Sequence, residues 1–357
     1  MAVLTVPFQR REHYEYKGVI HLHSRYSDGS GTVPQIMAEA AQAEVDFVML
    51  TDHDTLGALY AGEQGWHDGV LLLVGQEISP RTHHYLAFAL DEEIPGVDRI
   101  DYQNYVTEVN ERGGFGIIAH PYGGRKPPFF REKGHAWKDW GITGFTGIEI
   151  WSYMVDWVDR VNPLSLPYYY LFPEKAIRGP RPEALQKWDE IAQRRHIVGI
   201  GGVDAHAKQL PLFRFIKVFP YEYLFRTVRT HILLETPLSP PSLEESKAQV
   251  YGALKRGRCF FAYDLLADSM GFMFSCAMQD GTQLVMGDET TFVESAELFA
   301  SVPQPATIRL ICDGVTIAET QGKSLNHTVR QAGVYRVEAD YKSQPWIFSN
   351  PIFLRNA

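Results

Sequence analysis

The feature that most constrains the fold is a repeated alternation of strand-like and helix-like segments between Gly18 and about Ala205. Short, nearly continuous apolar runs recur there, among them "DFVMLTDH", "VLLLVGQE", "GFGIIAH" and "HIVGIGGVDAH". Between them lie helix-like stretches such as "TVPQIMAEAAQAEV", "IDYQNYVTEVNERG" and "RPEALQKWDEIAQRR". Such runs are typical of strands buried on both faces, and their alternation with helices indicates βα units in a parallel sheet or barrel.

The pattern changes near residue 237. A Pro-punctuated connection leads into one helix, and beyond "RCFFAYD" short alternating strands follow without helices, with "CDG" as a hairpin turn signal. We therefore expect an α/β domain over residues 1–262 and a small antiparallel β-sandwich over residues 263–357. Residues 122–145 and 152–181 are rich in aromatic residues, Gly and Pro without clear periodicity, and we expect them to form loops that wall a substrate pocket.

The composition excludes several classes of protein. Hydrophobic residues make up 45% and charged residues 22% of the 357 residues, which is typical of a globular protein. The formal charge of −9 argues against a general binder of nucleic acid or anionic membranes. No signal peptide or membrane span is recognisable, and three widely spaced cysteines indicate buried thiols. We expect a soluble, cytoplasmic protein with a small-molecule substrate and no membrane or nucleic-acid partner.

Histidines and carboxylates gather where the apolar runs end. Because the carboxyl ends of strands in a parallel barrel converge on one face, we expect these side chains to meet in one mouth. The ten residues are His21, His23, Asp52, His53, Glu77, His83, His84, His120, Asp204 and His206.

This mixture of side chains predicts a metal site. Residues two apart on a strand point the same way, so His21 and His23 can hold one ion or two neighbouring ions, and Asp204 with His206 repeats the arrangement. A single histidine at a strand end is usually structural. Five strand ends that all carry histidine or carboxylate side chains in register are, however, hard to obtain by chance. Imidazole combined with carboxylate suits zinc, manganese or iron.

The order of the motifs resembles one known family. "HLHSRYSDGS", "TDHD", "GQE", "HYLAF", "AHP" and "GVDAH", in this order over roughly residues 18–262, are similar to the PHP family, named for polymerase and histidinol phosphatase domains. The resemblance implies a distorted seven-stranded (β/α) barrel with two or three divalent transition-metal ions that hydrolyses phosphoesters.

The resemblance also implies a ligand set. One ion would lie among His21, His23, Glu77 and Asp204, and Glu77 would bridge to a second ion that His84 and His120 complete. A third would lie among Asp28, His53 and His206, with Asp28 standing where other members carry histidine. The residues expected to take part in catalysis are His21, His23, Glu77, Asp204 and His206.

Neighbouring residues receive other expected roles. His84 is favoured over His83 because it directly precedes the apolar "YLAF" run, and neighbours in a strand face opposite sides. Asp52 is expected to accept a hydrogen bond that orients a ligand. Glu149 in "GIEIW" is expected to line the pocket, and His231, outside this set, is expected to be structural.

Several basic residues border the expected mouth and are candidates for binding substrate. They are Arg25, Arg125, Lys126 and Lys208, to which His135 in the long segment after His120 is added. These residues favour a phosphoester, whose non-bridging oxygens need cationic partners. The alternative is an aryl carbamate or carboxylester hydrolase with the same metal centre, since the resemblance extends to a branch of the family that has a comparable C-terminal β-domain and includes aryl carbamate hydrolases. A third possibility is a metal-stabilised binding protein without turnover. The substrate, the metal and the oligomeric state stay open.

Overall fold

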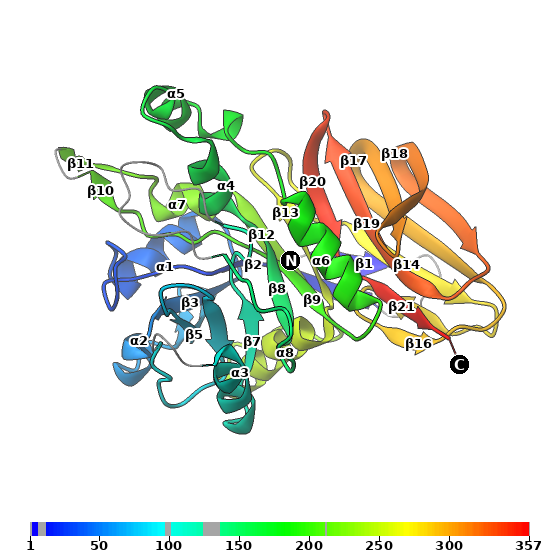
Figure 1. Ribbon diagram of the computed structural model, residues 1–357, viewed down its shortest axis with the longest axis horizontal. Coiled ribbons are helices and arrows are strands. Elements are labelled where there is room, and N and C mark those ends of the chain that lie inside the picture. Colours follow the sequence, from blue (N-terminus) through cyan, green and yellow to red (C-terminus); the bar gives the residue numbers. More distant parts are fainter. Residues whose placement is uncertain (1, 6–11, 97–100, 124–135, 211–212, 357) are drawn as a thin grey trace. The chain divides into compact units, whose positions relative to one another are not determined.

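The computed structural model of the chain describes residues 2–5, 12–96, 101–123, 136–210 and 213–356 (Figure 1). The chain forms two compact units. Unit 1 comprises Met1–Lys17, Pro182–Ile200 and Thr230–Ala357, and unit 2 comprises Gly18–Arg181 and Gly201–Arg229. Unit 1 is thus assembled from three separate segments, a division that differs from the consecutive domains 1–262 and 263–357 expected from the sequence.

Unit 2 contains most of the alternating region. Its strands are β3 (Phe47–His53), β4 (Gly65–His67), β5 (Val70–Ile78), β6 (Tyr85–Phe88), β7 (Phe115–Ile118), β8 (Gly147–Ser152), β10 (Gln209–Leu210) and β11 (Phe213–Lys217). Its helices are α1 (Val33–Gln42), α2 (Gly57–Tyr60), α3 (Tyr102–Glu111), α4 (Tyr153–Arg160), α5 (Leu166–Leu171) and α7 (Tyr221–Leu224), with a 3₁₀ turn at Pro173–Lys175. Three strands cross the boundary between the units: β2 (Glu12–Ile20), β9 (Val198–Gly202) and β12 (Val228–Leu234).

The strands of unit 2 pair in both directions. β2 is parallel to β3, β3 is parallel to β5, and β7 is parallel to β8. β6 is antiparallel to both β5 and β7, so the expectation of a purely parallel arrangement is wrong for this strand. The reason is the short connection, because only residues 79–84 separate β5 from β6 and a parallel crossover needs about a dozen residues or more.

The chain beyond β9 runs along the end of β2. The Val203 N–H donates to the Ile20 carbonyl at 3.1 Å, and the His23 N–H donates to the Ala205 carbonyl at 2.9 Å. The segments that follow β2 and β9, which carry several of the candidate residues, therefore lie side by side.

Burial and helix capping explain the main elements of unit 2. All nine residues of β5 are buried, as expected for a strand that is covered on both faces. α1 and α3 form where the sequence predicts helices, and at the start of α3 the Gln103 N–H donates to the Asp101 carboxylate at 3.0 Å. Residues 152–181, expected to be loops, instead contain α4 and α5, whose short lengths left too little periodicity to detect.

Unit 1 contains most of the C-terminal strands. Its remaining elements are β1 (Ala2–Thr5), α6 (Pro182–Ala192), α8 (Leu243–Arg256), β13 (Cys259–Tyr263), β14 (Met273–Met278), β15 (Gln283–Val285), β16 (Glu289–Thr291), β17 (Ala296–Cys312), β18 (Val315–Val329), β19 (Gly333–Tyr341), β20 (Gln344–Ser349) and β21 (Ile352–Arg355). β14, β15, β17, β18, β19 and β20 pair antiparallel around a buried apolar core that includes Phe260, Phe274 and Trp346. β16 and β21 are parallel, which departs from the expected antiparallel pattern.

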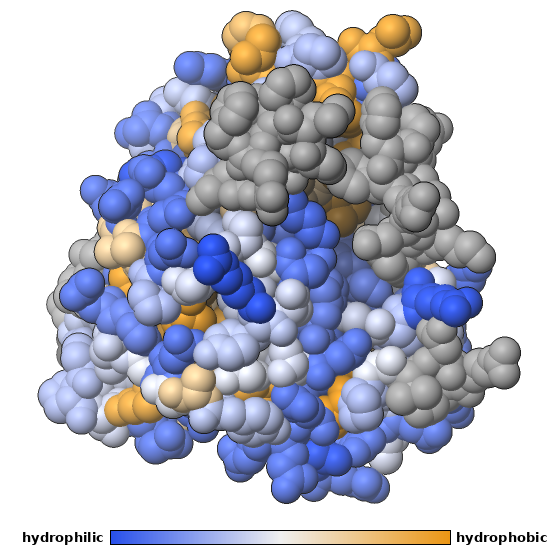
Figure 2. Space-filling view, turned by 90° about the vertical axis from the view of Figure 1, so that its left-hand side faces the viewer, coloured by the Kyte–Doolittle hydropathy of each residue, from blue (hydrophilic) through white to orange (hydrophobic). Residues whose placement is uncertain are grey.

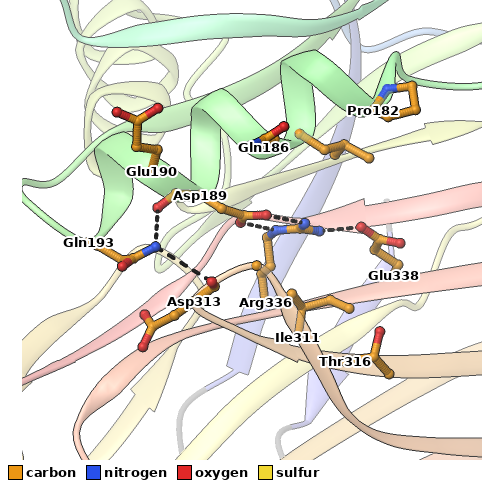
Figure 3. Close-up of a pocket in the computed structure, with 12 residues that line it drawn as sticks. Pro182, Gln186, Asp189, Glu190, Gln193, Ile311, Asp313, Thr316, Arg336 and Glu338 are labelled. Carbon is orange, nitrogen blue, oxygen red and sulfur yellow. Dashed lines mark hydrogen bonds and ion pairs between the residues drawn. The ribbon is translucent and has the colours of Figure 1, made fainter.

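A turn that the sequence predicts and an ion pair that it does not predict are two features of unit 1. β17 and β18 form a hairpin around Asp313 and Gly314, both of which have a positive φ, at the "CDG" turn signal. The side chain of Arg336 on β19 connects this region to α6, since its Nε lies 2.6 Å from Asp189 Oδ1 and its second terminal nitrogen lies 2.8 Å from Asp189 Oδ2 (Figure 3). Such a bidentate pair fixes the orientation of both side chains.

In the described part of the chain, no helix has both the length and the apolar character required to cross a membrane.

Candidate metal centre

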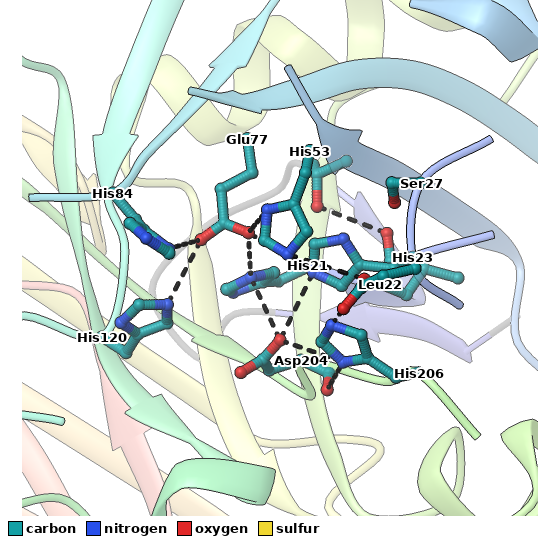
Figure 4. Close-up of polar contacts among 12 residues, drawn as sticks. His21, Leu22, His23, Ser27, His53, Glu77, His84, His120, Asp204 and His206 are labelled. Carbon is teal, nitrogen blue, oxygen red and sulfur yellow. Dashed lines mark hydrogen bonds and ion pairs between the residues drawn. The ribbon is translucent and has the colours of Figure 1, made fainter. Parts of the chain in front are cut away.

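The candidate site lies in unit 2, where the ends of its strands meet. Glu77 near the end of β5 is at its centre, and Figure 4 shows the surrounding imidazoles directed toward its carboxylate. Glu77 Oε1 lies 2.8 Å from His84 Nδ1 and 3.2 Å from His120 Nε2. Glu77 Oε2 lies 3.1 Å from His53 Nδ1 and 3.4 Å from the Nε2 atoms of both His21 and His23. One buried carboxylate therefore contacts five imidazoles.

The direction of β6 explains how His84 reaches this cluster. His84 immediately precedes β6, whereas Glu77 lies near the carboxyl end of β5. Because β6 runs antiparallel to β5, the start of β6 lies at the edge of the sheet where β5 ends. His84 therefore joins the site from the beginning of a strand and not from its end.

Asp204 is a second carboxylate in the cluster. Its Oδ1 lies 3.3 Å from His23 Nε2 and 3.5 Å from both His21 Nε2 and His206 Nδ1. Asp28 lies further out, with its Oδ1 3.0 Å from His206 Nε2 and 3.6 Å from His53 Nε2. The structure thus brings together all nine residues that the sequence predicted as ligands.

The backbone is unusual at three of these positions. His21, His120 and Asp204 have φ values of 67°, 27° and 52°, in the region that residues other than glycine seldom adopt. Such conformations cost on the order of 1–3 kcal/mol each and persist when the surrounding structure imposes them. The strain points to positions that are held for their chemistry.

The donor atoms fit a divalent metal. His21 Nε2, both ring nitrogens of His23 and Glu77 Oε2 are buried without a hydrogen-bond partner among the described residues. Groups of three or four donor atoms within 4.8 Å of one another occur four times in that part of the chain: His23, Asp28, His53 and His206; His21, Glu77 and His120; His21, His23 and Asp204; and His53, Glu77 and His84. Buried polar atoms left unsatisfied are costly, and a bound cation would satisfy these.

The electrostatics of the site agree with this fit. Burial and the neighbouring His206 lower the pKa of His23 to about 3, which keeps this imidazole neutral and able to bind a metal. Burial opposes a charge on His53, but Glu77 raises the pKa of His53 to about 9. Burial also opposes the charge of Glu77, yet the surrounding histidines hold its pKa well below the usual range. The carboxylates therefore need positive partners, whether protons on imidazole or metal ions.

Exposure shows from which side the cluster can be reached. The side chains of His21, His23 and Glu77 are at most 1% exposed. Those of Asp204 and His206 are 18% and 19% exposed, and those of His53 and Asp28 are 27% and 39% exposed. A substrate would therefore approach from the Asp28 and His53 side. Figure 2 shows that hydrophilic residues cover much of the face of unit 2 that carries α1 and α5.

Glu149 has a role that sequence reasoning missed. Its side chain is buried, and its two oxygens lie 3.0 and 3.1 Å from His21 Nδ1, while Oε2 also accepts from the His120 N–H at 2.7 Å. It therefore orients two candidate ligands and does not line the pocket as expected. A carboxylate behind a histidine fixes the tautomer that leaves Nε2 available to a metal. The one signal in the sequence is an acid inside the apolar strand "GIEIW".

Asp52 and His83 lie beside the cluster. Asp52 accepts hydrogen bonds from the Ser24 N–H at 2.7 Å and from the hydroxyls of Ser24 and Ser27 at 2.6 and 2.5 Å. It thus holds the turn that carries Asp28. The ring of His83 stacks on Tyr102 with centroids 3.7 Å apart, and His83 Nε2 accepts from the Lys138 N–H at 3.0 Å. His83 is therefore engaged in packing.

The expected substrate-binding residues fall into two groups. Lys208 Nζ lies 2.6 Å from Asp28 Oδ2 at the exposed side of the cluster. Arg25 is exposed, and its Nε donates to the Ser30 carbonyl at 2.8 Å. Arg125, Lys126 and His135 lie outside the described residues.

Comparisons with known proteins place this geometry in context. No family model matches the chain. An 85-residue stretch is 36% identical to phosphoribosyl 1,2-cyclic phosphate 1,2-diphosphodiesterase from Eggerthella lenta, covering 22% of this chain and 32% of that protein. The match therefore spans about a third of the length of this curated relative.

Solved structures that resemble the chain include two described as phosphoesterases. One is a two-domain protein from Bacteroides vulgatus containing a predicted PHP-like metal-dependent phosphoesterase, with 17% identity, a TM-score of 0.47 and 95% coverage of both chains. The other is a putative metal-dependent phosphoesterase from Bifidobacterium adolescentis, with 18% identity, a TM-score of 0.35, and coverage of 54% of this chain and 89% of that one.

Proposed function

We propose that this protein is a metal-dependent hydrolase, specifically a PHP-type phosphoesterase acting on a phosphomonoester or phosphodiester of a small molecule. The observation that carries the proposal is the buried Glu77 carboxylate, which lies within 3.4 Å of nitrogens from five imidazoles. Mixed imidazole and carboxylate donors are typical of hydrolytic metal sites. The local match to a phosphodiesterase supports the choice of a phosphoester.

The proposed centre holds two or three ions of zinc, manganese or iron. His21, His23, Glu77 and Asp204 would hold the first. Glu77, His84 and His120 would hold the second, and Asp28, His53 and His206 would hold the third. Divalent ions in such a site polarise an ester oxygen and lower the pKa of water.

The chain's own residues have distinct tasks in this mechanism. Hydrolysis forms a bond from the oxygen of water to phosphorus and breaks the bond from phosphorus to the leaving oxygen, which takes up a proton. Asp204 and His206 are the partly exposed members of the catalytic set, so water can reach them and transfer its proton there. Lys208, on the same side, is positioned to contact a non-bridging phosphate oxygen. Arg25 is a second candidate for this contact.

We also propose that the chain has the barrel and the C-terminal sandwich expected from the sequence. The pairing of β2, β3, β5, β6, β7 and β8, together with the chain around β9, is compatible with a distorted seven-stranded barrel. The antiparallel pairs among β14, β17, β18, β19 and β20 are compatible with a sandwich. We keep residues 1–262 and 263–357 as proposed domain limits and a cytoplasmic location as a proposal from the sequence.

A panel of substrates tests the proposed reaction. Protein reconstituted with manganese or zinc is offered aryl phosphates, phosphodiesters, nucleotides and aryl carbamates. Hydrolysis of a phosphate ester that ceases when the metal is chelated is the expected result. Turnover of aryl carbamates alone would replace the phosphoesterase proposal with the carbamate alternative, and absence of turnover in a metal-loaded protein would favour a binding protein.

Removing individual ligands tests the centre itself. His120→Ala and Asp204→Ala should each lose bound metal and lower kcat/KM by at least about a hundredfold, because both side chains belong to the central cluster. Metal content is measured by elemental analysis, and turnover is measured on the best substrate from the panel. Variants that retain full metal content and full turnover would contradict the proposed centre.

A further inference from the structure

A buried hydroxyl lies where three segments of the candidate centre meet. Tyr221, at the start of α7, is fully buried, and its hydroxyl lies 2.7 Å from the His23 carbonyl and 3.1 Å from the His206 carbonyl. The same oxygen accepts a hydrogen bond from the Gly31 N–H at 3.2 Å. Its partners belong to the segment after β2, the segment after β9, and the loop that carries Asp28.

The bonds of this hydroxyl match its chemistry. A phenol has one proton to donate and lone pairs to accept with, so it can donate to the nearer His23 carbonyl, or share its proton between the His23 and His206 carbonyls, while accepting from the amide. Burial raises the pKa of Tyr221 to about 12, so the hydroxyl stays protonated and keeps its donor at physiological pH. Each carbonyl belongs to a residue whose imidazole is in the cluster. The hydroxyl therefore acts on the backbone of candidate ligands and does not touch their rings.

Further hydrogen bonds join the loop that carries Asp28 to the segment after β9, and we call this contact region the junction. The Ser30 N–H donates to the His206 carbonyl at 2.9 Å, and the Ser30 hydroxyl donates to the Ala207 carbonyl at 2.8 Å. Across this junction, Asp28 Oδ1 lies 3.0 Å from His206 Nε2. The distance between these two side chains consequently depends on how the loop and the segment after β9 are held together.

We propose that Tyr221 is a positioning residue that holds His23, His206 and the Asp28 loop in register, and thereby forms the cation site among His23, Asp28, His53 and His206. The inference rests on the proposed metal centre. An ion held by Glu77, His84 and His120 would not depend on this junction, because the hydroxyl of Tyr221 bonds to the backbone of His23, Gly31 and His206 in the described part of the chain. Loss of the hydroxyl should therefore weaken chiefly the ion among His23, Asp28, His53 and His206, because the hydroxyl holds two residues of this group and one of the group His21, His23 and Asp204.

The test uses Tyr221→Phe, which removes the hydroxyl and retains the ring. The matched control is Tyr223→Phe, two residues along the same segment, whose hydroxyl contacts the Tyr153 hydroxyl at 2.9 Å. Metal-free full-length protein is titrated with Co²⁺, and the visible absorption of the bound ion reports each coordination step. We expect Tyr221→Phe to weaken one step by about tenfold to a hundredfold, the usual effect of losing a residue that orients ligands, while the control matches wild type.

The outcomes separate this inference from the proposed function. A Tyr221→Phe protein that binds the same number of ions with wild-type affinities would overturn the inference and leave the hydrolase proposal standing. Selective loss of one step would support it even if no substrate were hydrolysed. Wild-type protein that binds no Co²⁺ would overturn both. Denaturant unfolding of the metal-free proteins shows whether the fold is retained, and equal weakening of every step together with a large loss of stability would overturn the selective role.

Discussion

Glu149 lies behind His21, and the space it occupies depends on a glycine. A β-carbon added at Gly202 would lie 2.0 Å from Glu149 Oε1, a separation that real β-carbons do not reach. The glycine therefore leaves room for a carboxylate that contacts His21 Nδ1 and the His120 N–H. At the scale of single residues, the centre therefore depends on Glu149 and Gly202, which position the candidate ligands, as well as on the ligands themselves.

Two variants test this arrangement. Glu149→Ala should weaken metal binding by about tenfold to a hundredfold, because His21 loses the group that fixes its tautomer. Gly202→Ala should have a similar effect by displacing the same carboxylate. Metal affinity is measured by competition with a chelator. Gly141→Ala is the control, since it lies in an exposed loop where the added carbon would be 3.3 Å from a single side-chain oxygen. Wild-type affinity in both test variants would refute the role of Glu149.

At the scale of elements, the antiparallel direction of β6 brings its start to the cluster, and one of the two adjacent histidines that precede it enters the cluster. His84 contacts Glu77, and its neighbour His83 stacks on Tyr102. His83 has a φ of 68°, outside the extended region, so a turn of the backbone just before β6 separates a candidate ligand from a packing residue. This pair offers a closely matched comparison.

His84→Ala should reduce the number of ions bound, whereas His83→Ala should retain them. His83→Ala should instead lower the free energy of unfolding of the metal-free protein by about 0.5–1.5 kcal/mol, the usual contribution of an aromatic pair. Elemental analysis and urea unfolding measure the two effects. The reverse result, with metal lost only in His83→Ala, would show that the wrong histidine was chosen.

The sequence predicts which side chains gather but not how the strands run. Histidines and acids at the ends of apolar runs are conspicuous, and the structure brings them together. The direction of β6 is not encoded in its apolar pattern, and only the short connection from β5 hints at it. The role of Glu149 could not be assigned from the sequence, because an acid in a buried strand can either bind a metal or accept hydrogen bonds. Tyr221 could not be found at all, because its hydroxyl contacts backbone groups distant in the sequence.

At the scale of the whole molecule, unit 1 contains a second buried cluster, which joins parts of the chain far apart in the sequence. His231 on β12 lies 2.7 Å from Glu15 through Nδ1 and 3.0 Å from Asp264 through Nε2. The Ser269 hydroxyl donates to Asp264 at 2.6 Å, and the Gly271 N–H donates to Glu15 at 2.8 Å. His231 and Glu15 are fully buried, which suits the structural role that the sequence predicts for His231.

This cluster predicts a dependence of stability on pH. Burial alone would lower the pKa of His231, but Asp264 and Glu15 raise it from 6.5 to about 9. The proton on His231 therefore stabilises the folded state fully below about pH 6.5, by up to roughly 3 kcal/mol, and this contribution disappears as the pH rises through about 9. The difference in unfolding free energy between wild type and His231→Gln should accordingly shrink between pH 7 and pH 10 in urea titrations. A difference that stays constant or grows over this range would contradict the assignment.

The division of the chain between the two units has a consequence for how the protein is made. Unit 2 is complete once Arg229 has been synthesised, whereas unit 1 combines Met1–Lys17 with Thr230–Ala357. Since chains emerge from the ribosome amino end first and domains tend to fold as they appear, the unit with the candidate centre can form early. Glu15 must wait for His231 and Gly271, which are made much later. Glu15 is thus synthesised well before the residues that it contacts.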